Sequence, residues 1–154
     1  RVSIAAVNGP DSVVISGPRR LVELLSSVDL PADRFRILRG VSRAFHSPAM
    51  AAAAAGLQAA AGKLSLRDPS IPLASNVTGK IAENGLLTDP AYWGKHVLGT
   101  VRFYEGVIAL TDAGITTFVE VGPSALLCGM GRRALRAEAH PLVGGGGARD
   151  ATAP

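Results

Sequence analysis

Cysteine is almost absent from this sequence: Cys128 is the only one among 154 residues. A single thiol cannot form an internal disulfide, and it cannot build a metal cluster held by several thiolates. Long apolar runs are missing too, because no segment approaches the roughly 18 consecutive apolar residues that a membrane-spanning helix needs. The N-terminus shows no basic segment followed by an apolar block and a cleavage site, so we expect a cytoplasmic protein without a membrane segment.

Aromatic residues are also scarce, at 5% of the chain, and charged residues make up 18%. The net charge of +4 favours anionic partners, but the arginines are scattered and few rings are present to stack on bases. We therefore expect no nucleic-acid binding. The hydrophobic fraction of 47% is that of an ordinary soluble globular chain with one core or two small lobes.

Several kinds of site have no counterpart in the sequence. The histidines His46, His96 and His140 are far apart and lack the spacing of metal ligands, so no metal site is predicted. No glycine-rich turn has the strand and lysine of a phosphate-binding loop, and the acidic residues occur singly. We interpret His96, on a polar helix face, and His140, before a proline, as incidental.

The first 64 residues predict a small α+β lobe. Residues 2–7 and 12–16 are apolar runs on either side of the turn sequence Asn8-Gly9-Pro10-Asp11, which is the pattern of a β-hairpin. A helix with an apolar stripe follows, then an alternating strand over residues 34–41 and an alanine-rich helix to residue 64. We expect the antiparallel strands to be covered on one side by the two helices.

From residue 71 onward the pattern is that of an α/β lobe. Strands are expected over residues 71–75 and 116–121, and the second (TTFVEV) is almost continuously apolar, as in a parallel strand buried on both faces. A glycine turn and a helix follow this second strand. Residues 71–136 are therefore predicted to form the end of an α/β lobe, with helices beginning near Pro90, Val101 and Leu126.

The two ends of the sequence carry their own expectations. The chain begins without methionine and inside an expected strand, from which we expect it to be a piece of a longer polypeptide. Residues 137–154 include four consecutive glycines and little apolar content, which predicts a linker or disordered tail.

His46 is the strongest candidate for a catalytic residue. It lies in the stretch VSRAFHSPAM, where the strand expected over residues 34–41 gives way to the alanine-rich helix. An imidazole titrates near pH ~6.5 and can accept and return a proton at neutral pH, so His46 is a candidate general base. The same position is also typical of a hydrogen-bonded structural histidine.

Five motifs occur in order along the chain: AAVNGPDSVVISG from Ala5, RAFHSPAM from Arg43, SNVTG from Ser75, YW followed by VRF from Tyr92, and FVEVGPSALL from Phe118. Together they resemble the acyltransferase domains of polyketide synthases and the related malonyl-CoA:acyl carrier protein transacylases. The resemblance extends from residue 2 to about residue 135. It implies a ferredoxin-like small lobe at 2–64, which carries the catalytic histidine, followed by the C-terminal part of an α/β-hydrolase-like lobe at 71–136.

The resemblance also implies a mechanism. In this family a serine in a GHSxG motif attacks the thioester of an acyl-CoA, a histidine activates the serine, and the phosphopantetheine thiol of an acyl carrier protein receives the acyl group. His46 matches that histidine, and a backbone carbonyl near the residue that matches Arg102 would orient it. Asn8 matches an asparagine close to the cleft, although Asn8 before Gly9 is equally typical of a turn. Malonyl-CoA is then the substrate, and no cofactor is expected in this chain.

Two parts of the family's machinery do not occur here. The sequence contains no GHSxG motif, and the arginine that pairs with the malonyl carboxylate in the family lies upstream with that motif. We therefore expect this chain to be the C-terminal portion of an acyltransferase domain, which needs the N-terminal half and has a ketosynthase in the parent polypeptide. The alternative is a non-catalytic scaffold or carrier-protein docking fragment.

The residues before His46 also bear on the acyl donor. In the family, malonyl-selective domains tend to read HAFH at this point and methylmalonyl-selective domains YASH, whereas this chain reads RAFH from Arg43 to His46. Phe45 is the informative match, because its ring fills the space that an α-methyl branch would need. Arg43 departs from the pattern, and either places a charge near the acyl carboxylate or points to solvent.

Six arginines are the candidates for contact with CoA phosphates or an acidic carrier protein. The alternative interpretation of each is a solvated surface residue. They are Arg34, Arg36, Arg39, Arg132, Arg133 and Arg136.

Overall fold

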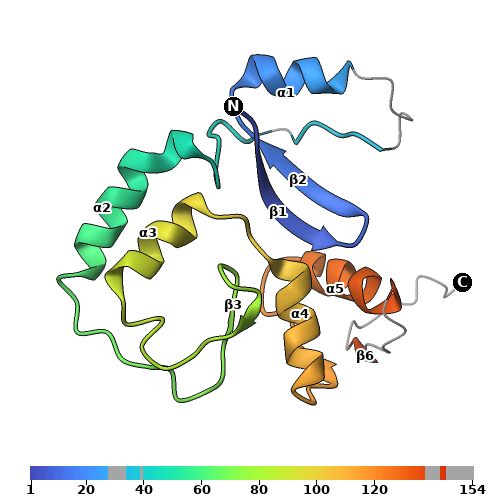
Figure 1. The fold of residues 1–154 in the computed structure, drawn as a ribbon. Helices are drawn as coiled ribbons and strands as arrows, with labels where there is room; N and C mark the ends of the chain where they lie inside the picture. Colours follow the sequence, from blue (N-terminus) through green and yellow to red (C-terminus); the bar gives the residue numbers. More distant parts are fainter. Residues whose placement is uncertain (28–33, 39, 138–142, 145–154) are drawn as a thin grey trace, which may run out of the picture.

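A computed structural model describes residues 1–27, 34–38, 40–137 and 143–144 of the chain (Figure 1). In the view of Figure 1, a hairpin and one helix lie at the top, a pair of helices on the left, and two further helices beside the far end of the hairpin. In chain order the elements are β1 (Ser3–Gly9), β2 (Ser12–Ser16), α1 (Arg19–Ser26), the 3₁₀ helix η1 (Pro48–Met50), α2 (Ala51–Ala61), β3 (Ala74–Ser75), β4 (Lys80–Ile81), α3 (Pro90–Leu98), α4 (Phe103–Asp112), β5 (Thr117–Phe118), α5 (Leu126–Ala137) and β6 (Val143–Gly144).

The hairpin predicted at the N-terminus is confirmed: β1 and β2 pair antiparallel, with Ser3 opposite Ser16 and Gly9 opposite Ser12. The turn is shorter than predicted, because β1 continues through Asn8 and Gly9. The register shifts between Val7 and Gly9, which places Asn8 at a bulge in the strand. Asn8 is thus a strand residue and not part of the turn.

The strand predicted over residues 34–41 does not form. Its described residues, 34–38 and 40–41, belong to no helix or strand, and Ile37, Leu38 and Val41 are about half exposed. Alternation determines which side of a segment is apolar, but a strand also needs a neighbour for its backbone hydrogen bonds. Within the described residues β1 is the only strand paired with β2. The ferredoxin-like description, which depends on this third strand, is therefore not confirmed.

The alanine-rich helix α2 packs against α3 and not against the hairpin, contrary to the prediction (Figure 1). Small residues permit the close approach: Ala54 on α2 is buried, and a Cβ added to Gly94 on α3 would lie 2.8 Å from the Gln58 side-chain oxygen. Alanine side chains are too short to cover a sheet, but they allow two helix backbones to come together. The predicted division of the chain between residues 64 and 71 remains a prediction.

The strand predicted over residues 71–75 is reduced to β3, which pairs antiparallel with β4 and has no parallel neighbour among the described residues. The turn between them is organised by Ser75, whose buried hydroxyl accepts the N–H groups of Val77 and Thr78 at 3.2 and 3.3 Å. Gly79 ends the turn with φ of +69°, and an added Cβ would lie 2.7 Å from the Glu105 Cβ. This turn therefore requires glycine.

The remaining predicted helices α1, α3, α4 and α5 are confirmed close to their expected positions. Asp89 caps α3, since its carboxylate accepts the Ala91 N–H at 2.8 Å and Pro90 occupies the first helical turn. None of the helices in the described residues is long and apolar enough to cross a lipid bilayer.

The C-terminal strand β5 covers two of the six residues predicted, and it pairs in parallel with β6. Val119 and Val121, expected in a strand buried on both faces, are 80% and 95% exposed. The apolar run is thus not covered here, because β5 has a single neighbour among the described residues. β6 falls in the segment predicted as a linker or tail, and residues 138–142 and 145–154 of that segment lie outside the described residues.

Candidate active site

His46 lies in a tight turn between a loop and η1, and not at a strand end as predicted. Among the described residues it is the only non-glycine residue with positive φ, at 55°. Such a conformation costs roughly 1–3 kcal/mol and persists only where the surroundings enforce it. Here Ser47 enforces it: its hydroxyl, 1% exposed as a residue, donates to the Ala44 carbonyl at 2.6 Å and accepts the Ala49 N–H at 3.3 Å.

The Nδ1 atom of His46 lies 2.9 Å from the carbonyl oxygen of Gly99. With its hydrogen on Nδ1, the imidazole donates to this carbonyl and keeps Nε2 as an unprotonated acceptor, which is the form that a general base requires. The sequence predicted an orienting carbonyl near Arg102, and the one observed belongs to the residue three positions earlier. The backbone N–H of Arg102 instead donates to the Asn76 carbonyl at 2.9 Å.

The loop that carries Gly99 is tied to the hairpin. The Thr100 hydroxyl donates to the Ile4 carbonyl at 2.8 Å. Val101 forms two backbone hydrogen bonds with β1: its N–H donates to Ala5 and its carbonyl accepts from Val7, each at 2.9 Å. The carbonyl that orients His46 is therefore fixed by residues about a hundred positions away in sequence.

His96, interpreted from the sequence as incidental, lies beside His46. Their ring centroids are 6.5 Å apart at an interplanar angle of 68°. His96 also approaches the rings of Tyr92 and Trp93, with centroid distances of 5.9 and 6.2 Å. Burial, and to a smaller extent the charge of His46, lower the pKa of His96. The sequence signal that was missed is its i, i+4 spacing from Tyr92, which places both side chains on one face of α3.

Tyr92 connects this group to the SNVTG motif. Its ring is buried, and its hydroxyl lies 3.0 Å from the Ser75 hydroxyl, within hydrogen-bond distance. Three of the five motifs found in the sequence, those containing His46, Ser75 and Tyr92, thus meet in one region of the fold. Motifs that meet in this way are expected of a functional site.

None of the other predicted site residues that the structure describes joins the hydrogen bonds of the turn at His46, which involve Gly99, Ala44 and Ala49. Phe45 is 49% exposed, Arg43 is exposed, and Asn8 is half-buried in β1. Within the described part of the chain, neither Arg43 nor Asn8 forms a side-chain hydrogen bond or ion pair. Arg102 pairs with Glu105 at 2.8 Å, away from the imidazole. In the same described residues, no group of three or more His, Cys, Asp or Glu side chains has the arrangement of a metal site.

A hollow region lies between α4, β5 and α5. It is an apolar cavity of about 200 Å³, lined among others by Phe103, Val107, Phe118 and Leu127. Glu120 lies at its rim and accepts the backbone N–H groups of Cys128 and Leu127 at 2.9 and 3.1 Å, which lowers the pKa of this carboxylate. His46 does not line this cavity, so the cavity and the imidazole are separate features.

Comparisons with known proteins agree with the motifs. The family model of the acyl transferase domain matches residues 1–151. The spectinabilin polyketide synthase system protein NorB of Streptomyces orinoci is 43% identical over 134 residues, which cover 87% of this chain and 6% of that protein.

Solved structures show the same relationship. The acyltransferase domain from the second module of the salinomycin polyketide synthase superposes with a TM-score of 0.76 at 40% identity, over 88% of this chain and 32% of that one. Malonyl CoA-acyl carrier protein transacylase from Burkholderia pseudomallei has a TM-score of 0.73 at 27% identity, over 88% of this chain and 48% of that one.

The chain therefore spans 32% and 48% of these two solved proteins, and 6% of its longer relative. Its fold is the α/β fold of the matching part of those domains. With motifs, family model and structures in agreement, the chain belongs to the acyltransferase family that includes the acyltransferase domains of polyketide synthases and the malonyl-CoA:acyl carrier protein transacylases.

Proposed function

We propose that this chain supplies the general base, His46, of an acyltransferase that moves a malonyl unit from malonyl-CoA to an acyl carrier protein. The observation that supports the proposal is the 2.9 Å contact between His46 Nδ1 and the Gly99 carbonyl. That contact leaves Nε2 free to take a proton from a serine hydroxyl. The solved relative named a malonyl CoA-acyl carrier protein transacylase supports the choice of donor and acceptor.

The proposed reaction has two halves. In the first, Nε2 of His46 accepts the serine proton while the serine oxygen forms a bond to the malonyl carbonyl carbon, and the carbon–sulfur bond of malonyl-CoA breaks. The imidazolium then returns its proton to the CoA thiolate. In the second, Nε2 accepts the proton of the phosphopantetheine thiol, whose sulfur attacks the acyl-serine ester, and the serine regains its proton. Because the sequence has no GHSxG motif, the serine and the malonyl-binding arginine come from a segment outside this sequence.

We further propose that the site joins two lobes, 2–64 and 71–136. His46 belongs to the first lobe, and the Gly99 carbonyl that orients it belongs to the second. Phe45 precedes the base and is 49% exposed, so its ring is free to line the space beside the acyl α-carbon. This arrangement favours a malonyl over a methylmalonyl donor. Arg43 and Asn8 are proposed to lie along the path by which malonyl-CoA reaches His46.

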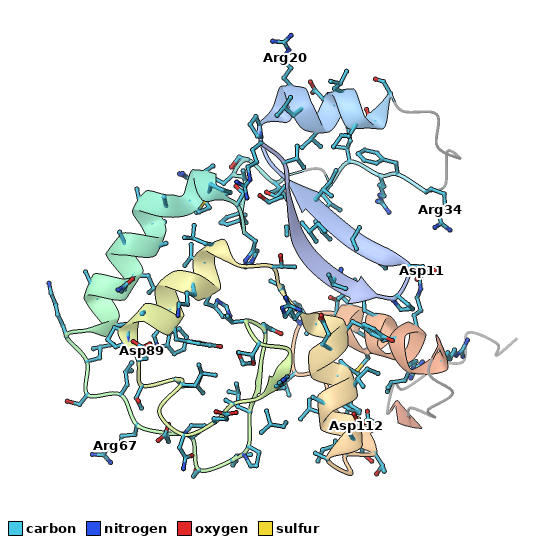
Figure 2. All side chains as sticks on the ribbon, viewed as in Figure 1. Asp11, Arg20, Arg34, Arg67, Asp89 and Asp112 are labelled. Carbon is cyan, nitrogen blue, oxygen red and sulfur yellow. The ribbon has the colours of Figure 1, made fainter. Side chains whose placement is uncertain are left out.

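The proposed partner is an acyl carrier protein, approached over basic surface. Arg34, Arg36, Arg132, Arg133 and Arg136 are exposed, whereas Arg39 lies outside the described residues. Arg34 points away from the body of the fold (Figure 2), and α5 lies beside the turn end of the hairpin (Figure 1). The basic residues lie on two separate segments of the chain, residues 34–36 and α5, and either is suited to acidic helices or CoA phosphates. A ketosynthase is expected in the parent polypeptide.

The test is to combine this chain with a segment that carries the GHSxG half of an acyltransferase and to measure acylation of that segment by labelled malonyl-CoA. We expect covalent labelling in the assembled pair and none with either part alone. A properly assembled pair that shows no labelling would instead favour the alternative, a scaffold or carrier-docking fragment.

A further inference from the structure

We propose that His96 is a positioning residue for His46: its ring, packed against Tyr92 and Trp93, forms a wall that keeps the His46 imidazole turned with Nδ1 toward the Gly99 carbonyl. The proposal rests on the proposed function of His46 as a base. His96 itself is not assigned a proton-transfer step or a contact with the substrate.

A wall is needed because one hydrogen bond fixes only one atom of a ring. Without a neighbour, rotation of the imidazole about its Cβ–Cγ bond would carry Nδ1 away from the carbonyl and put a carbon in its place. The 6.5 Å separation and 68° angle between His46 and His96 lie within the range of edge-to-face ring pairs. Such a neighbour blocks the rotation without competing for Nδ1.

The wall is itself held firmly. Tyr92 is buried and hydrogen-bonded to Ser75 at 3.0 Å, and the Trp93 indole N–H donates to the Leu87 carbonyl at 3.1 Å. The Tyr92 and Trp93 rings meet edge to face at 5.2 Å. His96 therefore sits in a group of rings that is anchored at two points on different segments.

The surroundings of His96 favour its neutral form, in which it does not repel a protonated His46. Among the described residues, the elements that contact α3 most are α2 and η1, and neither carries a titratable side chain. Tyr92 and His46 are the titratable rings beside it, and Lys95 on the same helix is exposed. Burial and the charge of His46 both lower the pKa of His96. Protonation of His46 during the reaction thus disfavours a second charge next to it.

The test is ¹⁵N NMR of the histidine-labelled chain, which reports the tautomer of each imidazole. The matched variants are His96→Ala, which removes the wall, and His96→Phe, which keeps a ring of similar size without a titrating group. We expect His46 to be protonated mainly at Nδ1 in the unmodified chain and in His96→Phe, and to populate both tautomers in His96→Ala. Unchanged tautomers in His96→Ala, or an equal loss in His96→Phe, would overturn the proposal. If His96→Ala loses its near-UV circular dichroism, His96→Val, whose side chain also lacks a ring and is shorter than that of histidine, takes its place with the same two outcomes.

Activity separates this proposal from the function on which it rests. In the assembled acyltransferase we expect His96→Ala to slow acyl-enzyme formation by roughly 10- to 100-fold, the usual effect of a misplaced group, and His96→Phe to restore most of that loss. Near wild-type acylation by His46→Ala would refute the proposed function, whatever the tautomers show. Loss of activity in His46→Ala together with full activity in His96→Ala would refute the positioning role alone.

Discussion

The turn at His46 and the β5–α5 end of the chain differ in how fully their side chains are packed and hydrogen-bonded within this chain. At the turn, His46 Nδ1 meets the Gly99 carbonyl, and Ser47 is 1% exposed with its hydroxyl bonded on both sides of the turn. At the other end, Val121 is 95% exposed and an apolar cavity of about 200 Å³ opens between α4, β5 and α5. The first region has its partners within this chain, and the second presents apolar surface to solvent.

In this fold, the contacts that orient the His46 ring are therefore complete, whereas the covering of the apolar residues near β5 is not. The hydrogen bond that orients His46 comes from the loop after α3, and the hairpin holds that loop in place. Exposed apolar surface of this kind marks a site of association. Since the solved relatives contain two to three times as much chain, we expect the β5–α5 end to be covered by a segment of that kind.

The sharpest contrast between the regions is expected for catalysis. In the assembled acyltransferase, His46→Ala should slow acyl-enzyme formation by about 10⁶-fold, since removal of a catalytic histidine has this effect in measured hydrolases. Val121→Ala should leave the rate at a saturating concentration of the GHSxG segment unchanged, while more of that segment is needed to reach it. Stopped-flow or quench-flow labelling measures both. If both variants lost a similar part of the acylation rate at a saturating concentration of the GHSxG segment, the two regions would not have the separate roles expected here.

Donor choice should depend on the turn alone. Replacing Phe45 by serine opens space beside the base, and a space of about one methyl group is worth roughly 1–3 kcal/mol, or 10- to 200-fold in kcat/KM. We expect Phe45→Ser to shift the ratio of malonyl-CoA to methylmalonyl-CoA use toward methylmalonyl-CoA within that range. Competition between the two esters measures the ratio. Equal use of both donors by the assembled acyltransferase without the Phe45 substitution would contradict the proposed preference for malonyl-CoA.

Stability should also differ between the two regions. Ser47→Ala removes a helix cap and leaves the Ala44 carbonyl without the hydrogen bond from the buried Ser47 hydroxyl, which typically costs about 1–2 kcal/mol. Val121→Ala, at a side chain that is 95% exposed, should change the free energy of unfolding of this chain by less than about 0.5 kcal/mol. Urea titration of both variants measures their free energies of unfolding. A larger loss of stability in Val121→Ala than in Ser47→Ala would contradict this prediction.

The smallest expected effect is on pH dependence. The pKa of His96 is lowered from 6.5, so the unfolded chain binds its proton first, and the stability that depends on neutral His96 falls as the pH drops below about 6.5. The pKa of Glu120 is lowered from 4.5, so its contribution is complete above that value and is lost only as the pH falls further.

Substituting His96 or Glu120 separates these two pH ranges. His96→Phe should flatten the fall in stability just below pH 6.5, and Glu120→Gln should flatten only the fall below pH 4.5. Chemical denaturation at a series of pH values measures both. If Glu120→Gln changed the fall in stability just below pH 6.5, the attribution of that fall to His96 would be contradicted.

Sequence patterns predicted the features that are set by neighbours in the chain. Periodicity and caps located α1, α3, α4 and α5, and the turn residues located the hairpin. The strand over residues 34–41 was wrong because alternation cannot report whether a pairing partner exists. The position of α2 was wrong because an alanine-rich helix carries no apolar stripe that is large enough to specify a partner.

The site was predicted in part for the same reason. His46 was identified through the motif around it, but its acceptor Gly99 and its neighbour His96 are brought in by folding across about fifty residues. A backbone carbonyl leaves no signature in the sequence, since any residue can provide one. His96 was discounted because a single histidine on a helix is common, and only the packing of α3 places it beside His46.

The central claim, that His46 acts as the base, is tested most directly by chemical rescue. At φ of 55° a glycine is favoured, so His46→Gly should keep the turn while leaving space for a small imidazole. In the assembled acyltransferase we predict that His46→Gly forms no acyl-enzyme, and that added imidazole restores its formation with a saturating dependence on concentration. Acylation by His46→Gly at the wild-type rate without imidazole would contradict the account.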